Sequence, residues 1–514
     1  MVPSDAGSPL PTPPRSTSAA SSSGPDRPAR DARWPAFAVC LGAGFMTLLD
    51  VTIVNVALPS IEGSLEAGPS ELQWILAGYT LAFGLALVPA GRLGDVYGRR
   101  NLFLIGLAAF VVTSAACGLV QSGPALAGVR FAQGLAAGVL NPQVIGFIQD
   151  LFKGPERGRA FGLFGATIGV STAIGPLAGG ALLAIFGEGE GWRSVFLVNV
   201  PIGLVLLPLA WKLLPRPEKK PEQKGARLDV VGSLLLAAAV VAIMWPFVTS
   251  TSEGSGGGSG DAAASAPSPA WWVIGVGAVL IAALVWWERR VTARGGLPLI
   301  PGNLLRVPSF TFGVGVSTLY FLSFTGIWLA STLYLQSGLG LSPLQAGLVL
   351  TPFSVAGAIA ATLGGRWISR IGRPLVVIGI AITVVALAAL DLVVMTVPEP
   401  TVIWVAAGIL LFAGFGNGLV ISPNQTLTLA RVPPIDAGAA AGSLQTMQRL
   451  GAAIGVSANA AAFFAVLAAT DSYTDAFATS LRVVVGVMLV ALVIAVVDWR
   501  RRSDVHESAV ESAS

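Results

Sequence analysis

An aspartate lies inside one of the long apolar runs of the chain. Asp50 belongs to the sequence LDVTIVNVALP at 49–59, within an apolar run that extends from 34 to 59. A charge at the centre of a membrane-spanning helix costs at least about 2.5 kcal/mol, so we expect this carboxylate to face a water-filled cavity or a charged partner. Burial disfavours the charged form when it is unpaired, and such a carboxylate can take up and release protons. A static ion pair or a polar packing contact is the alternative interpretation.

A second charged residue, Arg130, lies in the apolar run 123–149 within the sequence RFAQG. Arginine keeps its charge and its forked guanidinium matches a carboxylate, so Arg130 is a candidate partner for Asp50. A pair that forms in one conformation and separates in another would couple proton binding to shape. Alternatively, Arg130 only donates to carbonyl groups of neighbouring helices. The secondary candidates are Asn55 and Gln133, in the same two motifs, and two further charges in apolar runs, Asp391 and Arg449.

The composition predicts that membrane helices hold these residues. Hydrophobic residues make up 54% and charged residues 11% of the 514 positions, whereas a soluble globular protein carries about 25% charged residues. The apolar residues form blocks of about 20 residues or more, the length that crosses a bilayer core of about 30 Å. The fourteen blocks are 34–59, 71–91, 101–121, 123–149, 159–186, 194–213, 229–249, 270–288, 308–335, 343–364, 374–397, 400–424, 437–466 and 478–498.

Several functions are excluded by what the sequence lacks. No lysine follows a glycine, so the chain contains no phosphate-binding loop of the form G-x-x-x-x-G-K-[ST] and is not expected to use ATP. The single histidine, His506, lies in the polar C-terminal tail, and Cys40 and Cys117 lie in apolar blocks, so no metal site is expected. A formal net charge of +4 implies no surface for nucleic acid.

The basic residues predict the orientation of the helices. With the N-terminus inside, 27 of the 31 Lys and Arg residues fall in cytoplasmic segments, and only Arg193 falls in an outer loop. Because short cytoplasmic loops collect Lys and Arg, we expect both termini in the cytoplasm and the chain in the plasma (inner) membrane. Many arginines and alanines against few lysines are consistent with a GC-rich bacterial genome.

An internal repeat relates the two ends of the chain at an offset of 274 residues. The Gly-Arg pairs at 91–92 and 98–99 recur at 365–366 and 372–373, and Ser369 stands where the first loop has Asp95. The offset pairs the first six apolar blocks with the last six and leaves two blocks between them. Parallel six-helix repeats are typical of transporters.

Two glycine-rich segments complete the motifs. The loop GRLGDVYGRR at 91–100 combines turn glycines with an acid four residues before a base, which favours local ion pairing; an anchor of basic residues is the alternative. The run 159–186 carries glycines at three- and four-residue spacing, which allow close helix contact, and Pro176, which bends a helix. Helix packing alone is the alternative for this stripe.

Together these motifs resemble those of the major facilitator superfamily over residues 34–500, specifically its fourteen-helix drug:proton antiporter branch. The resemblance implies proton coupling at Asp50 and Arg130, and an acid-dependent latch that the second half lacks because of Ser369. It implies a cytoplasmic gate formed by Gly91, Arg92, Asp95, Gly98 and Arg99. It also implies the antiporter motif of exporters at Gly165, Gly169, Gly175, Pro176, Gly179 and Gly180.

The expected fold is therefore an all-α membrane protein with 6+2+6 transmembrane helices in two parallel-repeat halves. Two six-helix halves are expected to enclose a cavity near the bilayer midplane. The expected segments are a disordered cytoplasmic tail (1–33), the N-terminal half (34–213), a cytoplasmic linker (214–228), two extra helices with an outer Gly/Ser-rich loop (229–288), a second cytoplasmic linker (289–307), the C-terminal half (308–498) and a cytoplasmic tail (499–514).

The expected function is proton-coupled export of lipophilic drugs or antibiotics by alternating access. The expected partners are a lipophilic or cationic small molecule, protons and the lipid bilayer; no cofactor is needed beyond the proton gradient. The alternative is a dedicated transporter of one endogenous metabolite, by export or by proton symport. An enzyme or receptor would show a catalytic cluster or a sizeable soluble domain, and the sequence has neither.

Overall fold

Helices make up all the regular structure in the part of the chain that the computed structural model describes, which is residues 30–187, 189–216, 229–253, 271–294, 296, 298–399, 401–433 and 436–511. The helices are α1 (Arg30–Leu65), α2 (Pro69–Tyr97), α3 (Arg99–Leu119), α4 (Gly123–Leu151), α5 (Pro155–Phe186), α6 (Trp192–Leu197), α7 (Asn199–Leu213), α8 (Val230–Glu253), α9 (Trp272–Ala293), η2 (Leu304–Arg306), α10 (Pro308–Leu333), η3 (Tyr334–Gly338), α11 (Pro343–Ile371), α12 (Pro374–Thr396), α13 (Thr401–Leu429), α14 (Ala437–Thr470) and α15 (Tyr473–Glu511).

Thirteen helical segments of the described chain are long and apolar enough to cross a membrane, with α6 and α7 counted as one. A fourteenth, α8, holds the shorter apolar stretch Val230–Pro246. Proline stands at the first position of α5, α10, α11 and α12, where its missing N–H costs no hydrogen bond. These segments match the predicted blocks, and the 6+2+6 fold is confirmed.

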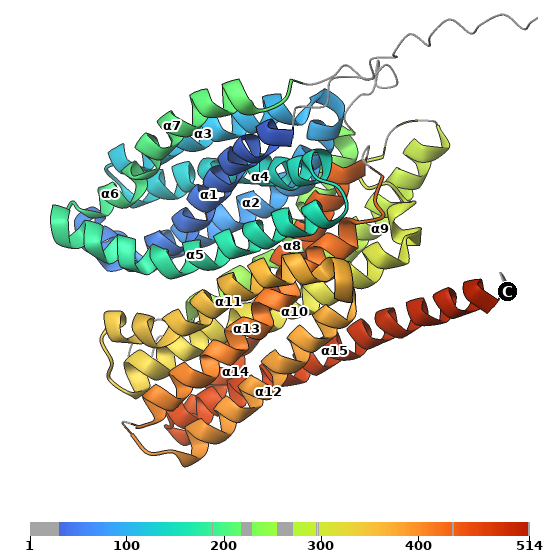
Figure 1. The fold of residues 1–514 in the computed structure, drawn as a ribbon. Helices are drawn as coiled ribbons and strands as arrows, with labels where there is room; N and C mark the ends of the chain where they lie inside the picture. The colour runs from blue at the N-terminus through green and yellow to red at the C-terminus, as the bar shows by residue number, and fades with distance from the viewer. Residues whose placement is uncertain are drawn as a thin grey trace, which may run out of the picture.

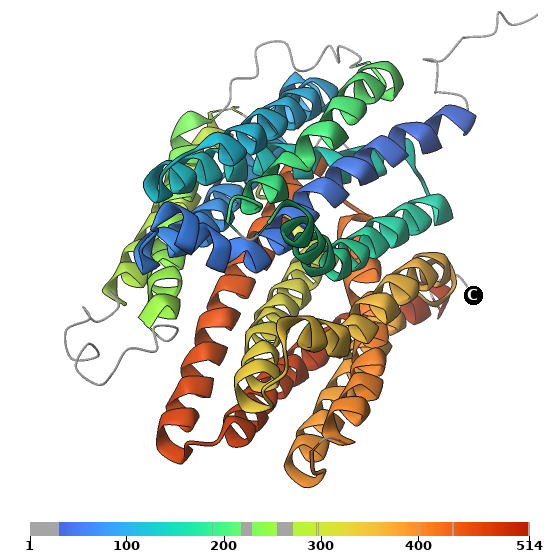
Figure 2. The same cartoon turned by 90° about the vertical axis from the view of Figure 1, so that its left-hand side faces the viewer.

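Two six-helix bundles lie side by side, α1–α7 in one and α10–α15 in the other (Figures 1 and 2). Equivalent helices of the repeat pack alike: α2 packs on α4 as α11 packs on α13, and α1 packs on α5 as α10 packs on α14. The bundles meet along α5 with α11 and along α2 with α14, while α8 and α9 pack together with α8 against α2 and α14. One apolar core lies within the second bundle, and the core of the first bundle extends across the interface to Phe310, Leu429 and Leu444 of the second.

Several expected boundaries differ from the helix ends. Helix α1 begins at Arg30 and so includes the last four residues of the expected tail, and α15 continues to Glu511, past the expected end at 498. Helix α9 extends to Ala293 into the expected second linker. Residues 1–29, most of the first linker and the Gly/Ser-rich loop lie outside the described residues.

Candidate functional site

The carboxylate of Asp50 lies at the centre of a closed polar network inside the first bundle. Asp50 is fully buried on α1, and its Oδ2 accepts a hydrogen bond from Arg130 Nη1 of α4 at 2.6 Å. Its Oδ1 accepts from Gln133 Nε2 at 3.1 Å and from Asn199 Nδ2 at 3.0 Å. Three donors from two helices therefore hold one carboxylate away from solvent, and the structure brings Asp50, Arg130 and Gln133 together.

Aromatic rings and a carbonyl fix the guanidinium of Arg130. Its central carbon lies 4.1 Å from the ring centroid of Tyr79 and 5.6 Å from that of Phe196, at distances that allow cation–π attraction. Arg130 Nε donates to the carbonyl of Ile75 at 3.3 Å, and Nη1 also donates to Gln133 Oε1 at 2.8 Å. The arginine is thus tied to α2 as well as to α1.

Two members of the network were not predicted as site residues. Asn199 is the first residue of α7, directly after Val198, the single residue between α6 and α7, and its amide donates to Asp50. Ser114 of α3 accepts from both Gln133 Nε2 at 3.1 Å and Asn199 Nδ2 at 3.0 Å, and donates to the carbonyl of Phe196. The sequence signal for Asn199 was a polar residue within the apolar block 194–213.

Residues 91–100, expected to form a loop, instead comprise the last turns of α2, the joint at Gly98 and the start of α3, and they contact the start of α14 in the other bundle. Both carboxylate oxygens of Asp95 accept from the backbone N–H of Gly438 at 3.0 Å, and Oδ2 also accepts from Ala439 N–H at 3.0 Å. Arg92 Nη1 lies 3.3 Å from Asp436 Oδ1, and both of these residues are buried. The N-terminus of a helix attracts negative charge, so Asp95 is placed where it caps α14 best.

Arg99 forms an ion pair with Asp95 and links α3 to α4. Its Nη2 lies 3.0 Å from Asp95 Oδ1, its Nη1 lies 2.7 Å from Asp150 Oδ2, and it donates to the carbonyl of Gly146. Gly98 has a φ of 96°, a conformation that glycine adopts without strain, and forms the sharp joint between α2 and α3. A Cβ at Gly91 would lie 2.2 Å from the carbonyl oxygen of Gly438, so this contact between the bundles requires glycine.

The equivalent segment of the second bundle, residues 365–373, has no contact like that of Asp95 with α14 among the described residues. Ser369, at the position equivalent to Asp95, is exposed, and its hydroxyl donates to the carbonyl of Arg366 in its own helix. Helix α5, whose start is equivalent to that of α14, instead meets α11 through glycines. A Cβ at Gly158 would lie 2.7 Å from the carbonyl oxygen of Gly365. The contact that Asp95 makes between the bundles therefore has no counterpart at Ser369 within the described residues.

The glycines of α5 serve two different neighbours. A Cβ on Gly165 would lie 3.0 Å from Ala361 Cβ, and one on Gly169 would lie 3.1 Å from the carbonyl oxygen of Ser354, both on α11 of the other bundle. Gly175 and Gly179 face α1 of the same bundle. A Cβ at Gly180 would meet nothing within 4 Å, and the side chain of Pro176 lies outside the described part.

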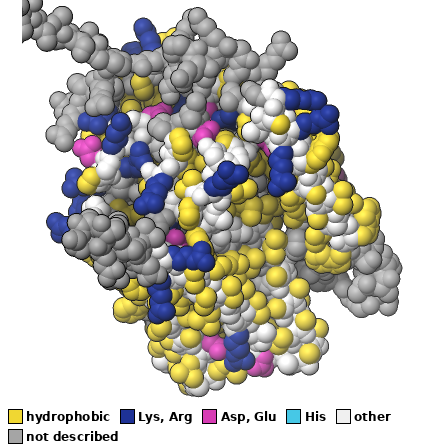
Figure 3. Space-filling view, turned by 90° about the vertical axis from the view of Figure 1, so that its right-hand side faces the viewer, with side chains coloured by type: hydrophobic (Ala, Val, Ile, Leu, Met, Phe, Trp, Pro, Cys, Tyr) yellow, Lys and Arg dark blue, Asp and Glu magenta, His cyan; other side chains and the backbone are white. Residues whose placement is uncertain are grey.

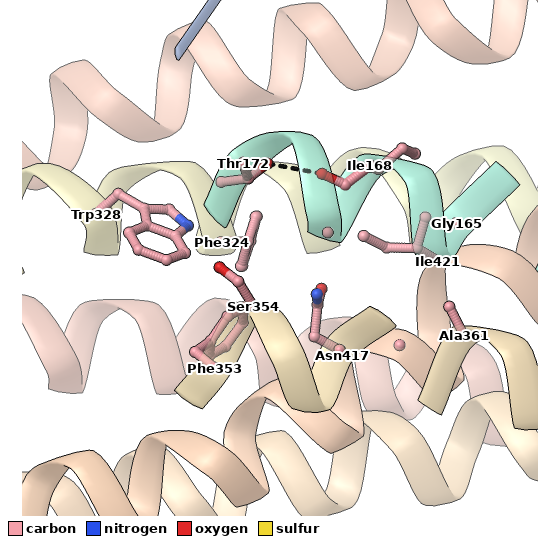
Figure 4. A pocket seen from close by; sticks show the side chains of 13 residues that line it. Gly165, Ile168, Thr172, Phe324, Trp328, Phe353, Ser354, Ala361, Asn417 and Ile421 are labelled. Atoms are coloured by element: carbon pink, nitrogen blue, oxygen red, sulfur yellow. Dashed lines mark hydrogen bonds between the residues drawn. The ribbon is translucent and has the colours of Figure 1, made fainter. Parts of the chain in front are cut away.

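A cavity lies between the two bundles, lined by α5 on one side and by α10, α11 and α13 on the other (Figure 4). Its wall carries Phe324 and Phe353, with ring centroids 5.5 Å apart, and Trp328, 5.4 Å from Phe353. Thr172 and Asn417 add polar groups, and Asn417 Oδ1 also accepts from a tyrosine of α10. An apolar wall with few polar groups is typical of a site for a small organic molecule.

The remaining candidates do not join the Asp50 network. Asn55 is exposed and makes no hydrogen bond to the described residues. Asp391 of α12 pairs with Arg482 of α15 at 3.0 Å, in the other bundle. Arg449 of α14 lies with its guanidinium carbon 4.4 Å from the ring centroid of Phe83. Within the described residues there is also no group of three His, Cys, Asp or Glu that would hold a metal ion.

Lys and Arg side chains gather at the end of the molecule toward which the C-terminus points (Figure 3). This basic end carries the segments at 91–100, 153–159 and 366–373, so the contacts of Asp95 and Arg92 with α14 lie there. Exposed large apolar side chains, among them Ile105, Val112 and Trp404, cover the flanks of the helices, as expected for a surface in lipid.

Comparisons with known proteins agree with this architecture. The sequence profile of the Major Facilitator Superfamily matches residues 40–456. The probable actinorhodin transporter of Streptomyces coelicolor is 35% identical over 448 residues, which cover 86% of this chain and 75% of the relative. The puromycin resistance protein of Streptomyces alboniger is 32% identical over 503 residues and 94% of each chain. The cephamycin export protein of Amycolatopsis lactamdurans is 34% identical over 80% of this chain and 82% of its own.

Solved structures share the fold at low sequence identity. A human organic anion transporter superposes with a TM-score of 0.61 at 16% identity, over 91% of this chain and all of its own. A proton:xylose symporter superposes with a TM-score of 0.62 at 15% identity, over 91% of this chain and 96% of its own. With a family profile that covers most of its length and relatives above 30% identity, the chain belongs to the major facilitator superfamily as a multi-pass membrane transporter.

Proposed function

We propose that the chain exports lipophilic antibiotics or similar drugs across the plasma membrane in exchange for protons. The observation that carries the proton coupling is the buried pair of Asp50 and Arg130, 2.6 Å apart and shielded from solvent on all sides. The direction of transport and the class of substrate are supported by relatives named for antibiotic export and resistance.

Proton binding at Asp50 would release the groups that hold its charge. The carboxylate accepts from Arg130, Gln133 and Asn199, and charge-assisted hydrogen bonds of this kind are stronger than neutral ones. A proton on Asp50 removes the charge, weakens all three bonds and leaves Arg130 as a buried cation without its counter-charge. Helices α1, α4 and α7 then repack, and loss of the proton restores the network.

The basic end would face the cytoplasm, because short cytoplasmic loops collect Lys and Arg. Asp95 and Arg92 then close the cytoplasmic side in this conformation by holding α14. Separation of these contacts opens the cavity inward for loading, and their closure releases the substrate outward. The aromatic wall of Phe324, Trp328 and Phe353 would contact the apolar part of the substrate.

The test is efflux of a fluorescent lipophilic dye from vesicles under an imposed pH gradient. We expect wild-type protein to show proton-dependent efflux and Asp50→Asn to lose it. Asp391→Asn is the matched control, because Asp391 also pairs with an arginine inside the helical region but lies in the other bundle. Efflux that survives Asp50→Asn but fails in Asp391→Asn would contradict the proposed coupling site, and efflux independent of the gradient would contradict antiport.

A further inference from the structure

Arg449 is a charge inside the helical bundle that the proposed proton exchange does not use. It is the only charged residue in α14 and follows the first residue, Ala437, by twelve positions, about 18 Å along the helix. No Asp or Glu of the described residues lies within salt-bridge distance of its guanidinium. An unpaired cation at this depth is costly and is retained where it has a function.

The helices packed against α14 offer no acid at this level. Helices α10 and α13 have no charged residue, the only acid of α8 is Glu253 at its last position, and α2 has no charge between Glu71 and Arg92. The single charge of α4 at mid-height is Arg130, whose partner is Asp50. The acids in the sequences of α2, α4 and α15 lie toward helix ends or in ion pairs: Glu71, Asp95, Asp150, Asp475, Asp498, Asp504, Glu507 and Glu511.

One face of the Arg449 guanidinium packs on an aromatic ring, and the N–H groups around its edge remain available for hydrogen bonds. Its carbon lies 4.4 Å from the ring centroid of Phe83, a cation–π contact that leaves the N–H groups in the guanidinium plane available, and the side chain is partly exposed. Phe83 stacks on Tyr79, and Tyr79 is near enough to interact electrostatically with Arg449. The hydroxyl of Tyr79 is buried and has no hydrogen-bond partner among the residues that the structure describes.

We propose that Arg449 binds an anionic group of the transported molecule, so that the substrates are lipophilic anions with a carboxylate or an acidic phenol. Such a group would supply the counter-charge that Arg449 lacks and an acceptor for the hydroxyl of Tyr79. This inference deepens the proposed function and rests on it for the direction of transport. Arginine suits the role because its planar fork matches a carboxylate with two parallel hydrogen bonds.

The interior acids of the two six-helix bundles are paired with arginines and offer a cationic substrate no free carboxylate. Asp50 is occupied by Arg130 and Asp391 by Arg482, and α11, which lines the cavity, carries no acid. The sequence suggested a lipophilic or cationic substrate. The proposed substrate keeps the lipophilic character and replaces the positive charge with a negative one. A one-to-one exchange of such an anion for a proton moves two positive charges inward, so the membrane potential drives it as well as the pH gradient.

Binding to purified full-length protein in lipid nanodiscs tests the proposal without any gradient. Three probes share one fluorescent ring system and differ in charge: 9-anthracenecarboxylate, neutral 9-anthracenemethanol and cationic 9-anthracenemethylamine. We expect wild-type protein to bind the carboxylate about tenfold more tightly than the alcohol, as for one charge-assisted contact. Arg449→Gln should bring the carboxylate down to the affinity of the alcohol and leave the alcohol unchanged.

Two further variants keep the result interpretable. Arg449→Lys retains the charge without the fork and should keep part of the preference. Arg370→Gln removes an exposed arginine at the basic end and should change nothing. Preference for the amine, no saturable binding of the carboxylate, or an equal loss of all three probes in Arg449→Gln would overturn the proposal. Because binding needs no gradient, these outcomes are separate from a failure of proton-dependent efflux.

Discussion

The carboxylate of Asp95 caps the backbone N–H of Gly438 across the interface between the two bundles, with both oxygens 3.0 Å from the nitrogen. Asp95 lies in the last turn of α2 and Gly438 in the first turn of α14, 343 residues later in the chain. One side chain of the first repeat thus satisfies backbone donors of the second. A contact of this kind stabilises one arrangement of the bundles and is lost when they separate at the basic end.

Asp95→Asn should therefore shift the population toward conformations open at the basic end. Loss of a capping charge costs about 1 kcal/mol, which changes such an equilibrium about fivefold. Spin labels at the exposed positions Lys153 and Arg370, one on each bundle, would report the change. We expect a larger fraction of long distances in Asp95→Asn than in the wild type.

Ser369→Ala is the matched control for this shift, because Ser369 holds the equivalent position of the second repeat. Its hydroxyl bonds only to the carbonyl of Arg366 in its own helix, so its removal should leave the distances unchanged. An unchanged distance distribution in Asp95→Asn, or an equal shift in both variants, would show that the cap does not hold the bundles together.

Arg130→Met should destabilise the protein strongly, by about 3–5 kcal/mol, because it leaves the carboxylate of Asp50 buried without its partner. The double variant Asp50→Asn with Arg130→Met removes both charges and should recover part of this loss while proton-dependent efflux stays absent. Thermal unfolding in detergent measures the stability of each variant.

Arg482→Met provides the comparison, since the side chains of Arg482 and Asp391 are 58% and 22% exposed. Exposed ion pairs contribute about 0–1 kcal/mol, so this variant should unfold close to the wild-type temperature. If Arg130→Met proved no worse than Arg482→Met, Asp50 would have to be neutral or solvated in the folded protein, against the closed network around it.

A separate prediction concerns the second link at the basic end, the buried pair of Arg92 and Asp436. Arg92→Gln and Asp436→Asn should each lower the unfolding temperature, and the double variant should cost less than the sum because each single variant leaves a buried charge behind. A double-mutant cycle of thermal unfolding measures this coupling. Additive effects would show that the two side chains act independently.

The sequence predicted three members of the Asp50 network, Asp50, Arg130 and Gln133, but not Asn199 and Ser114. A charge in an apolar run must find a partner or water, so Asp50 and Arg130 stand out from their surroundings. Asn199 and Ser114 carry no such requirement, because a small polar side chain in a membrane helix is compatible with many contacts. Their place in the network follows from the way α3 and α7 pack against α1 and α4, which the spacing of residues in the sequence does not reveal.

The glycine stripe of α5 shows the same limit. Its spacing predicted close helix contact, and the helix does pack closely, yet Gly165 and Gly169 face α11 while Gly175 and Gly179 face α1. The spacing of glycines in the sequence identifies which face of a helix is flat, but it does not identify which other helix packs against that face. The three- and four-residue spacing is interrupted between Gly169 and Gly175. The glycines before the interruption therefore lie toward α11, and those after it lie toward α1.

Gly175→Ala should disturb the proton site from a distance. The added Cβ would lie 2.0 Å from Thr52 Oγ1 and 2.7 Å from Thr52 Cβ, so α1 and α5 must move apart. Thr52 follows Asp50 by two residues on α1, and overpacking of this kind costs about 1–3 kcal/mol. We expect a lower unfolding temperature and weaker proton-dependent efflux. Thr52→Ala in the same chain removes the nearer atom and should restore part of both.

Gly180→Ala is the control for this prediction, five residues along the same helix, where an added Cβ meets no atom within 4 Å. Alanine is favoured over glycine in a helix by up to about 1 kcal/mol, so this variant should unfold at the wild-type temperature or slightly above it. Efflux that is normal in both variants would mean that α1 and α5 can separate at Gly175 without moving Asp50. Loss of efflux in both would place the sensitivity in α5 itself rather than in its contact with α1.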